Sequence, residues 1–358
     1  MGVRGIDTQR AEQFTERVLG IVNDGMLSLM ISVGHRVRLF DYMSQLPAST
    51  SEAIASASNL NERYVREWLG AMVVGGIVEY QPDGKTYSLP PEHAAALTRA
   101  AGVGNMAVQA EYVPLLASVE KQIVSCFENG GGVPYSEFDD FQRLMAEESG
   151  QVLDAALLES TLPLVDGLVE RLESGIDVAD VGCGSGHAIN IMAERFPRSR
   201  FVGYDFSEEG IAAARAESAS RGSKNAEFQV RDAAGLGGPA RFDFITTFDA
   251  IHDQAHPDRV LTAIAAMLRP GGTYLCVDIG ASSRLEENIE HPLGPLLYTV
   301  SCMHCMTVSL AYGGAGLGTV WGEQKALEML LAAGFTDTEV KRVEGDILNN
   351  YYVAIKPK

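Results

Sequence analysis

Basic residues are scarce in this chain of 358 residues: 28 lysines and arginines stand against 47 aspartates and glutamates, a formal net charge of −19. A surface of that sign repels the phosphates of nucleic acids and membranes. Long apolar runs are also missing, since no stretch approaches the ~18 consecutive apolar residues of a membrane span. The sequence therefore predicts a protein that acts on a small molecule and binds neither nucleic acid nor a membrane.

Cysteine is rare too, with five residues in the whole chain: Cys126, Cys183, Cys276, Cys302 and Cys305. Their odd number and scattered positions are typical of reduced thiols rather than of a disulfide framework. The N-terminus also lacks a basic-then-apolar secretion signal, so we expect a cytoplasmic protein. A zinc site at Cys302 and Cys305 would need a second Cys/His pair at suitable spacing, and none is visible, so we expect no metal.

An apolar strand that runs into a glycine-rich turn is the most informative pattern present. It reads Asp177-Val-Ala-Asp180-Val-Gly182-Cys183-Gly184-Ser185-Gly186. Gly182 and Gly184 carry no Cβ and can therefore bring the backbone unusually close to a ligand. The dinucleotide fingerprint does not fit, because His187 stands where that pattern wants a glycine or alanine beside a pyrophosphate.

Two carboxylates indicate which ligand the turn would hold. Asp180, just ahead of the turn, is a poor neighbour for a phosphate and a good acceptor for an ammonium group. Asp205 ends the next predicted strand, 23 residues after Gly182, and is spaced to accept both hydroxyls of a ribose. A ligand with an amine, a ribose diol and no phosphate is S-adenosylmethionine.

The segment from about Leu153 to the C-terminus resembles a class I S-adenosylmethionine-dependent methyltransferase. Beyond the glycine turn, Val230-Arg-Asp232-Ala233 is similar to the strand end that this family uses to bind the adenine amine, and Leu268-Arg-Pro-Gly-Gly272 resembles the turn before its fifth strand. The residues that we expect to bind the cofactor are Asp180, Gly182, Cys183, Gly184, Asp205, Phe206, Asp232, Ala233 and Phe248.

The first third of the chain predicts helices followed by a hairpin over residues 77–80 and 86–89, which is a winged-helix pattern. It resembles the N-terminal domain of plant and bacterial small-molecule O-methyltransferases, where that fold serves dimerisation. A small core of this kind cannot bury all of the apolar segment at residues 26–31, so we predict a homodimer that covers it.

The rest of the chain predicts an α/β fold with a doubly wound, mostly parallel sheet of seven strands. We expect these near residues 177–181, 201–205, 226–230, 242–247, 273–278, 337–343 and 350–356. The predicted domains are a winged helix over 1–100, a helical connector over 101–172 that covers the cofactor, and a catalytic domain over 173–358. Residues 280–320 interrupt the alternation of strands and helices and predict a lid over the substrate.

Residues that follow strand ends face the ligand crevice in such sheets. His252 follows the fourth strand, and its segment resembles the catalytic histidine of plant-type O-methyltransferases, which implies a general base. Asp278 ends the fifth strand and would hold the base or a substrate hydroxyl. His304 in the lid and Asn349 in the last hairpin are the candidate substrate contacts.

Two alternatives remain at this stage. The first is methylation at nitrogen or carbon, which needs no base. A hydroxyl acceptor is favoured, and these two acceptors stay open. The second alternative is a winged-helix regulator that binds DNA and senses S-adenosylmethionine. In the helix that would contact DNA, however, the negative charges of Glu62 and Glu67 offset the positive charges of Arg63 and Arg66.

Overall fold

The computed structural model describes residues 5–358, and the chain divides into two compact units, Met1–Ala117 and Ser118–Lys358. The finer division at residues 100 and 172 stays a prediction. Each unit has its own apolar core, and the two are described in turn.

The first unit has the predicted winged-helix order. Asn61 accepts the N–H of Arg63 at 3.0 Å and so begins the helix that ends at Gly75. A hairpin follows, with Tyr80 opposite Tyr87. The elements are α1 (Thr8–Arg36), α2 (Leu39–Met43), α3 (Ser51–Ser58), α4 (Glu62–Val74), β1 (Glu79–Gln81), β2 (Thr86–Ser88), α5 (Pro91–Leu97) and α6 (Tyr112–Ala117).

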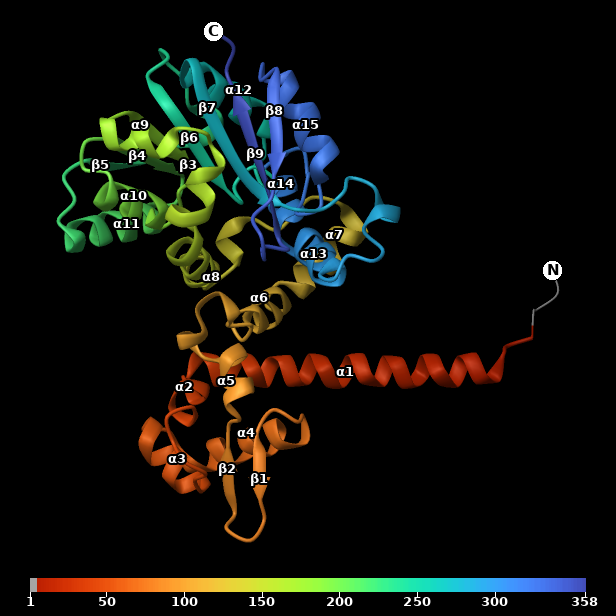
Figure 1. The fold of residues 1–358 in the computed structure, drawn as a ribbon. Helices are drawn as coiled ribbons and strands as arrows, with labels where there is room; N and C mark the ends of the chain where they lie inside the picture. The colour runs from red at the N-terminus through yellow and green to blue at the C-terminus, as the bar shows by residue number, and fades with distance from the viewer. Residues whose placement is uncertain (1–4) are drawn as a thin grey trace. The chain divides into compact units, whose positions relative to one another are not determined.

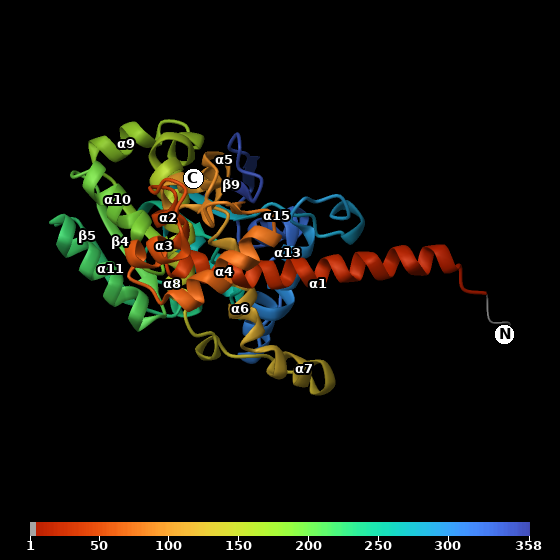
Figure 2. The same ribbon diagram turned by 90° about the horizontal axis from the view of Figure 1, so that it is seen from below.

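Helix α1 extends far beyond the other elements of its unit (Figures 1 and 2). Its second half packs on the unit's core, and the indole N–H of Trp68 donates to the carbonyl of Met30 at 2.8 Å. By length and composition alone this helix could cross a membrane, which the sequence analysis did not anticipate.

The expected excess of apolar surface at residues 26–31 is present in part, since Met26 is exposed and Leu27, Leu29, Met30 and Ile31 are half-buried. Leu27, Met30 and Ile31 pack in part against the core, because the helix continues past them to Arg36. Further exposed apolar side chains lie one to three turns earlier, at Phe14, Val18, Leu19, Ile21 and Val22.

The second unit contains the predicted seven-stranded sheet, in the order β5-β4-β3-β6-β7-β9-β8. Strand β9 runs antiparallel to both of its neighbours, and the other pairs are parallel. The turn from β8 to β9 therefore lies at the edge where β3 to β7 end, as predicted. The strands are β3 (Asp177–Val181), β4 (Arg200–Asp205), β5 (Ala226–Val230), β6 (Phe242–Phe248), β7 (Leu268–Ile279), β8 (Asp337–Lys341) and β9 (Asn349–Ile355).

Helices cover both faces of this sheet (Figure 1). Alternate strand residues point to opposite faces, so Val178 packs with the helices α9 (Leu168–Ser174), α10 (His187–Arg195) and α11 (Glu208–Arg221). Ala179 packs instead with α12 (Pro257–Met267) and α15 (Gly322–Ala332). The unit begins with α7 (Glu120–Asn129) and α8 (Phe141–Ala156).

Residues 280–320 form short helices rather than an open loop. They are α13 (Gly294–Val300), a π-helical turn at Ser301–Cys305, and α14 (Met306–Ala311), followed by a glycine-rich segment. That segment is tied to the loop after β6, since the N–H of Gly318 donates to the carbonyl of His252 at 3.1 Å. The action of this region as a lid stays a prediction.

Candidate active site

The turn after β3 has a conformation that its glycines make possible. Gly182 and Gly184 have φ angles of +77° and +51°, which side chains rarely adopt. A Cβ on Gly182 would lie 2.5 Å from the Cβ of Ala250, whereas one on Gly184 would meet nothing within 4 Å. Cys183 between them is partly buried. Gly182 is thus needed for packing, and Gly184 leaves open space where a ligand can approach the backbone.

Asp205, at the end of β4, is oriented by the backbone of two loops. Its Oδ2 accepts the N–H of Gly184 and its Oδ1 accepts the N–H of Ser207, each at 2.8 Å. Burial raises the pKa of this carboxyl, although the backbone hydrogen bonds oppose the shift. Each carboxylate oxygen has more than one lone pair, so the side chain can still accept hydroxyl groups of a ligand.

Asp180 lies inside β3 and is 2% exposed. Thr246 on the neighbouring strand β6 donates its hydroxyl to Oδ1 of Asp180 at 2.8 Å. Burial raises the pKa of Asp180 to about 7, against the opposing effect of this hydrogen bond. A cation beside the carboxyl would favour its ionised form, so this position suits an ammonium group.

The remaining candidate cofactor residues lie at the ends of the adjacent strands. Asp232 follows β5 and accepts the N–H of Ala234 at 2.9 Å, and Ala233 between them is buried. Phe206 is 52% exposed directly after β4, and Phe248 ends β6. The order β5-β4-β3-β6 brings these positions to a single edge of the sheet.

His252 and Asp278 are in direct contact. Nδ1 of His252 lies 2.7 Å from Oδ1 of Asp278, and both side chains are buried. The same oxygen accepts the indole N–H of Trp321 at 3.1 Å. Burial opposes a charge on the imidazole, yet the carboxylate of Asp278 raises the pKa of His252 above its ordinary value. Because Nδ1 is bonded to Asp278, Nε2 is the nitrogen left for Cys305, and a ligand that exchanges a proton with Nε2 would replace that contact.

Asp249 completes a cluster of three ionisable groups. Its φ of +49° is uncommon for a residue with a side chain. Single ligand atoms of Asp249, His252 and Asp278 all lie within 4.8 Å of one another, a spacing that a metal ion could bridge. Although Asp249 is exposed, the protein around its carboxyl and then the charge of Asp278 raise its pKa to about 8.

His304, one of the two candidate substrate contacts, is 1% exposed in the π-helical turn. Its ring stacks on Phe141 with a centroid distance of 3.9 Å and meets the edge of Phe138 at 4.5 Å. Burial, and to a lesser extent the nearby charge of His252, lowers the pKa of His304 to about 3. The imidazole is therefore neutral at physiological pH.

Asn349, the other candidate substrate contact, begins β9 opposite Ile279 at the end of β7. Its Nδ2 donates to Oδ2 of Asp346 at 3.1 Å, and its Oδ1 is buried with no partner. Asn349 thus lies at the edge of the sheet where β3 to β7 end, and its side chain is bonded to the β8–β9 turn, not to His252.

The sequence analysis missed the parts of the site that depend on long-range contacts. These are Thr246 on Asp180, Trp321 on Asp278, and Cys305, which forms a hydrogen bond with His252. The sequence analysis also assigned no function to Asp249, which lies three residues before His252. Its place directly after a strand was the only available signal.

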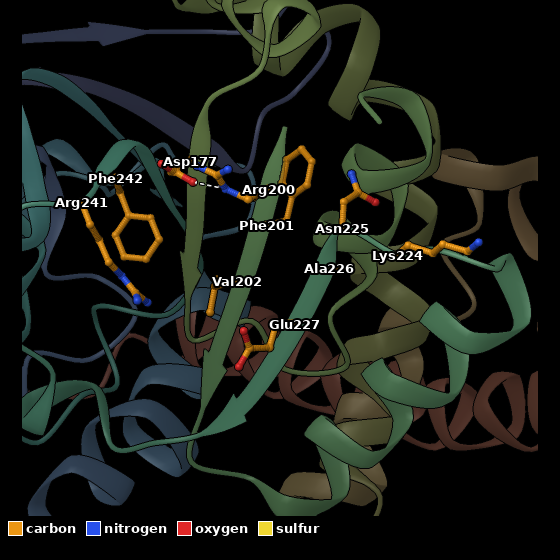
Figure 3. Close-up of a pocket in the computed structure, with 10 residues that line it drawn as sticks. All are labelled: Asp177, Arg200, Phe201, Val202, Lys224, Asn225, Ala226, Glu227, Arg241 and Phe242. Carbon is orange, nitrogen blue, oxygen red and sulfur yellow. Dashed lines mark hydrogen bonds and ion pairs between the residues drawn. The ribbon is translucent and has the colours of Figure 1, made fainter. Parts of the chain in front are cut away.

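A cavity of about 300 Å³ lies at the opposite edge of the sheet (Figure 3). Its side chains come from the first residues of β3 to β6 and the loops before them, including Asp177, which pairs with Arg200 at 2.7 Å. Arg241 stacks over the ring of Phe242 at 4.5 Å from its centroid. This cavity is therefore separate from the strand ends that carry His252.

Two family models match the chain. Residues 25–99 match the Rv2258c-like winged HTH domain, and residues 172–334 match a methyltransferase domain. The chain thus carries a winged-helix domain followed by a methyltransferase domain. This confirms the resemblance that the glycine turn, Asp205 and the later motifs indicated.

Curated proteins match part of this chain. A fatty-acid O-methyltransferase of Mycolicibacterium smegmatis is 32% identical over 148 residues, which is 41% of this chain and 47% of that protein. A nocamycin O-methyltransferase of Saccharothrix syringae is 34% identical over 129 residues, 34% of this chain and 45% of that protein. The chain thus spans about half the length of the curated relatives it matches.

Solved methyltransferase structures match almost the whole fold. A putative O-methyltransferase from Nostoc punctiforme has a TM-score of 0.72 at 17% identity, covering 95% of this chain and 98% of that one. Human N-acetylserotonin methyltransferase in complex with S-adenosylmethionine has a TM-score of 0.66 at 18% identity, with 100% of each chain covered. At such identities the likeness shows the fold, including its N-terminal helical domain.

Proposed function

We propose that this protein transfers a methyl group from S-adenosylmethionine to a small organic acceptor, at a hydroxyl oxygen. The observation that carries the proposal is the single edge of the sheet where β3, β4, β6 and β7 end. Asp205 is oriented there by the glycine turn, and the His252–Asp278 pair lies two strand ends away.

The residues on this edge fit the cofactor. Asp205 would accept the ribose hydroxyls, and Asp180 would balance the ammonium group. The bare backbone at Gly184 gives the ligand close access, while Asp232 and Ala233 are at the position for the adenine amine. When bound, S-adenosylmethionine supplies an electrophilic methyl group on its sulfonium sulfur.

His252 would act on the acceptor. Its Nε2 takes the hydroxyl proton, because Asp278 holds Nδ1 and stabilises the imidazolium that results. Trp321 donates to the same oxygen of Asp278 and so limits the rotation of that carboxylate. A base of this kind favours an oxygen acceptor over nitrogen or carbon acceptors, which need no proton removal at this point.

Three further features belong to this proposal. The connector over residues 101–172 would cover the cofactor, which the edge-to-face contact of Tyr135 with Phe206 at 5.4 Å supports.

The exposed apolar residues of α1 favour a homodimer. All five cysteines are free, as in proteins of a reducing cytoplasm.

The proposal is tested by the calorimetric affinity for S-adenosylmethionine of the wild type and of Asp205→Ala. Charged hydrogen bonds are worth ~1.5–3 kcal/mol each, so we expect binding at least about tenfold weaker in the variant. Glu227→Gln, at the exposed start of β5, is the matched control and should bind normally. Because Asp205 also anchors Gly184, circular dichroism must show a folded variant. Unchanged affinity in folded protein would remove Asp205 from the cofactor site.

A further inference from the structure

The glycine-rich segment after α14 has five glycines in ten residues, over residues 313–322, and we call it the glycine strap. Two of these glycines lie so close to other segments that a side chain would not fit. A Cβ on Gly314 would lie less than 3.0 Å from the backbone of Ala255. A Cβ on Gly318 would lie less than 3.0 Å from Oγ of Ser301. The strap is therefore a closely packed segment, and its glycines are what allow the close approach.

Main-chain hydrogen bonds hold the strap against the loop that carries the candidate base. The N–H of Ala315 donates to the carbonyl of Ala255 at 2.9 Å, and the N–H of Gly318 donates to the carbonyl of His252 at 3.1 Å. The two bonds lie three residues apart on each segment, so they fix the strap and the loop along a full turn of chain. A displacement of the strap would therefore move the backbone of His252.

The last side chain of the strap reaches the partner of the base. The indole N–H of Trp321 donates to Oδ1 of Asp278 at 3.1 Å, and the same oxygen lies 2.7 Å from Nδ1 of His252. It also accepts the N–H of Ile279 at 2.8 Å. By contrast, Oδ2 of Asp278 is buried and has no partner among residues 5–358. Three donors on one oxygen and none on the other oppose rotation of the carboxylate.

We propose that the glycine strap keeps the candidate base aligned, with Gly318 as a positioning residue for the backbone of His252 and Trp321 as a positioning residue for Asp278. This inference rests on the proposed function and adds to it the segment that holds its base. With Oδ1 fixed, the proton stays on Nδ1 of His252, and Nε2 is the nitrogen that a ligand can use. Catalytic groups need such support, because small errors of geometry are costly.

Exchange of the Nδ1 proton of His252 with water tests the proposal without an acceptor. A proton held by a buried carboxylate resonates downfield of the amide protons, and saturation transfer from water gives its exchange rate in the full chain. His252→Gln assigns the resonance by its loss. Trp321→Phe keeps an aromatic ring but removes the donor, so we expect exchange at least about tenfold faster, the value of one hydrogen bond to a charged group.

The chain offers a matched control for this substitution. Trp68 is its only other tryptophan, and its indole donates to the carbonyl of Met30 in the first unit. Trp68→Phe removes the same kind of donor away from the base and should leave the exchange rate unchanged. If the strap only packed the fold, Trp321→Phe would lower the melting temperature without changing that rate.

Two glycine variants test the strap itself. Gly318 and Gly313 have φ angles of +74° and +66°, so alanine strains the backbone similarly at both positions. A Cβ on Gly313 would meet nothing within 4 Å among the described residues, whereas one on Gly318 would collide with Ser301. Only Gly318→Ala should displace the strap and speed exchange of the Nδ1 proton. This pair also tests the proposal if circular dichroism shows that Trp321→Phe does not fold.

The possible results separate this inference from the proposed function. Equal exchange rates in the wild type and in folded Trp321→Phe, equal rates in the two glycine variants, or no downfield resonance in the wild type would overturn the inference. Binding of S-adenosylmethionine by the wild type is measured separately by calorimetry. Its failure would contradict the proposed function, while the exchange rates would still be measured.

Discussion

The contact between His252 and Asp278 determines at which pH the imidazole is free to accept a proton. Asp278 raises the pKa of His252 above its ordinary value of 6.5, because its carboxylate outweighs the penalty of burial. Only the neutral ring can act as a base, so the rate should fall as pH drops through this raised pKa. The ion pair stabilises the fold below pH 6.5, and its contribution is lost as pH rises through the folded-state pKa.

Replacing His252 by alanine should lower turnover by ~10²–10⁴-fold, the usual contribution of a general base. Cofactor affinity should barely change, because in the proposed function the ring would contact the acceptor and not the adenosine. A panel of phenols and hydroxy acids is screened first to find an acceptor, and single-turnover rates are then compared. Near-normal turnover in the variant would favour transfer to nitrogen or carbon and make Asp278 the next residue to test.

Replacing Asp278 by asparagine should move the acidic limb of the rate profile to lower pH. The substitution keeps the size of the side chain but removes the charge that raises the pKa of His252. The rate of the wild type should therefore fall on the acidic side at a pH above 6.5. The rate of the variant should fall at a lower pH than that of the wild type. An identical profile in both proteins would mean that Asp278 does not control the base.

At the scale of elements, α1 is the segment whose surface lacks a partner within its own unit. Val18 and Val22 lie four residues apart on one face, with Phe14 a turn before them, and all three are exposed. Exposed apolar stripes of this kind mark protein contacts more often than free surface. A second copy of the same helix would cover this face in a homodimer.

The double variant Val18→Lys with Val22→Lys should convert a dimer into a monomer in sedimentation velocity at micromolar concentration. Two lysines on the stripe would place charge in an apolar interface, which is costly without partners. Gln9→Lys with Gln13→Lys adds the same charge to exposed polar positions of α1 and serves as the control. A wild type that sediments as a monomer would disprove the dimer.

At the scale of the whole molecule, a winged helix in a methyltransferase leaves open the alternative of a DNA-binding regulator. The electrostatics oppose it. The net charge is −19, and on α4 Arg63 pairs with Glu67 at 2.5 Å while Arg66 pairs with Glu62 at 3.3 Å. Cations that are already paired on their own helix release few counterions from DNA.

We accordingly expect no binding to a random DNA duplex by fluorescence anisotropy at 50 mM salt. The double variant Glu62→Gln with Glu67→Gln frees both arginines and shows whether the pairing is what prevents binding. Affinity of the wild type that falls steeply between 50 and 200 mM salt would revive the regulator, since that slope reports phosphate contacts.

Much of this fold was predictable because its signals are local. Each of the seven strands overlaps its predicted range, and the glycine turn, the cap at Asn61 and the hairpin of the first unit depend on residues close together in sequence. The position of Asp205 at the end of β4 was predictable for the same reason, since it follows from the local pattern of its strand. The apolar surface of α1 extends further towards the N-terminus than the predicted segment at residues 26–31, because apolar composition does not say where a core ends.

The sequence by itself determined the methyltransferase family, the sheet and the edge at which a ligand would bind, because strand order and chain direction follow from the alternation of elements. Only the tertiary structure decided which side chains meet there. Trp321 is 43 residues from Asp278, and His304 is 163 residues from the Phe141 ring on which it stacks. Such pairs form when distant segments pack, and packing depends on shape and burial throughout the unit rather than on any local pattern.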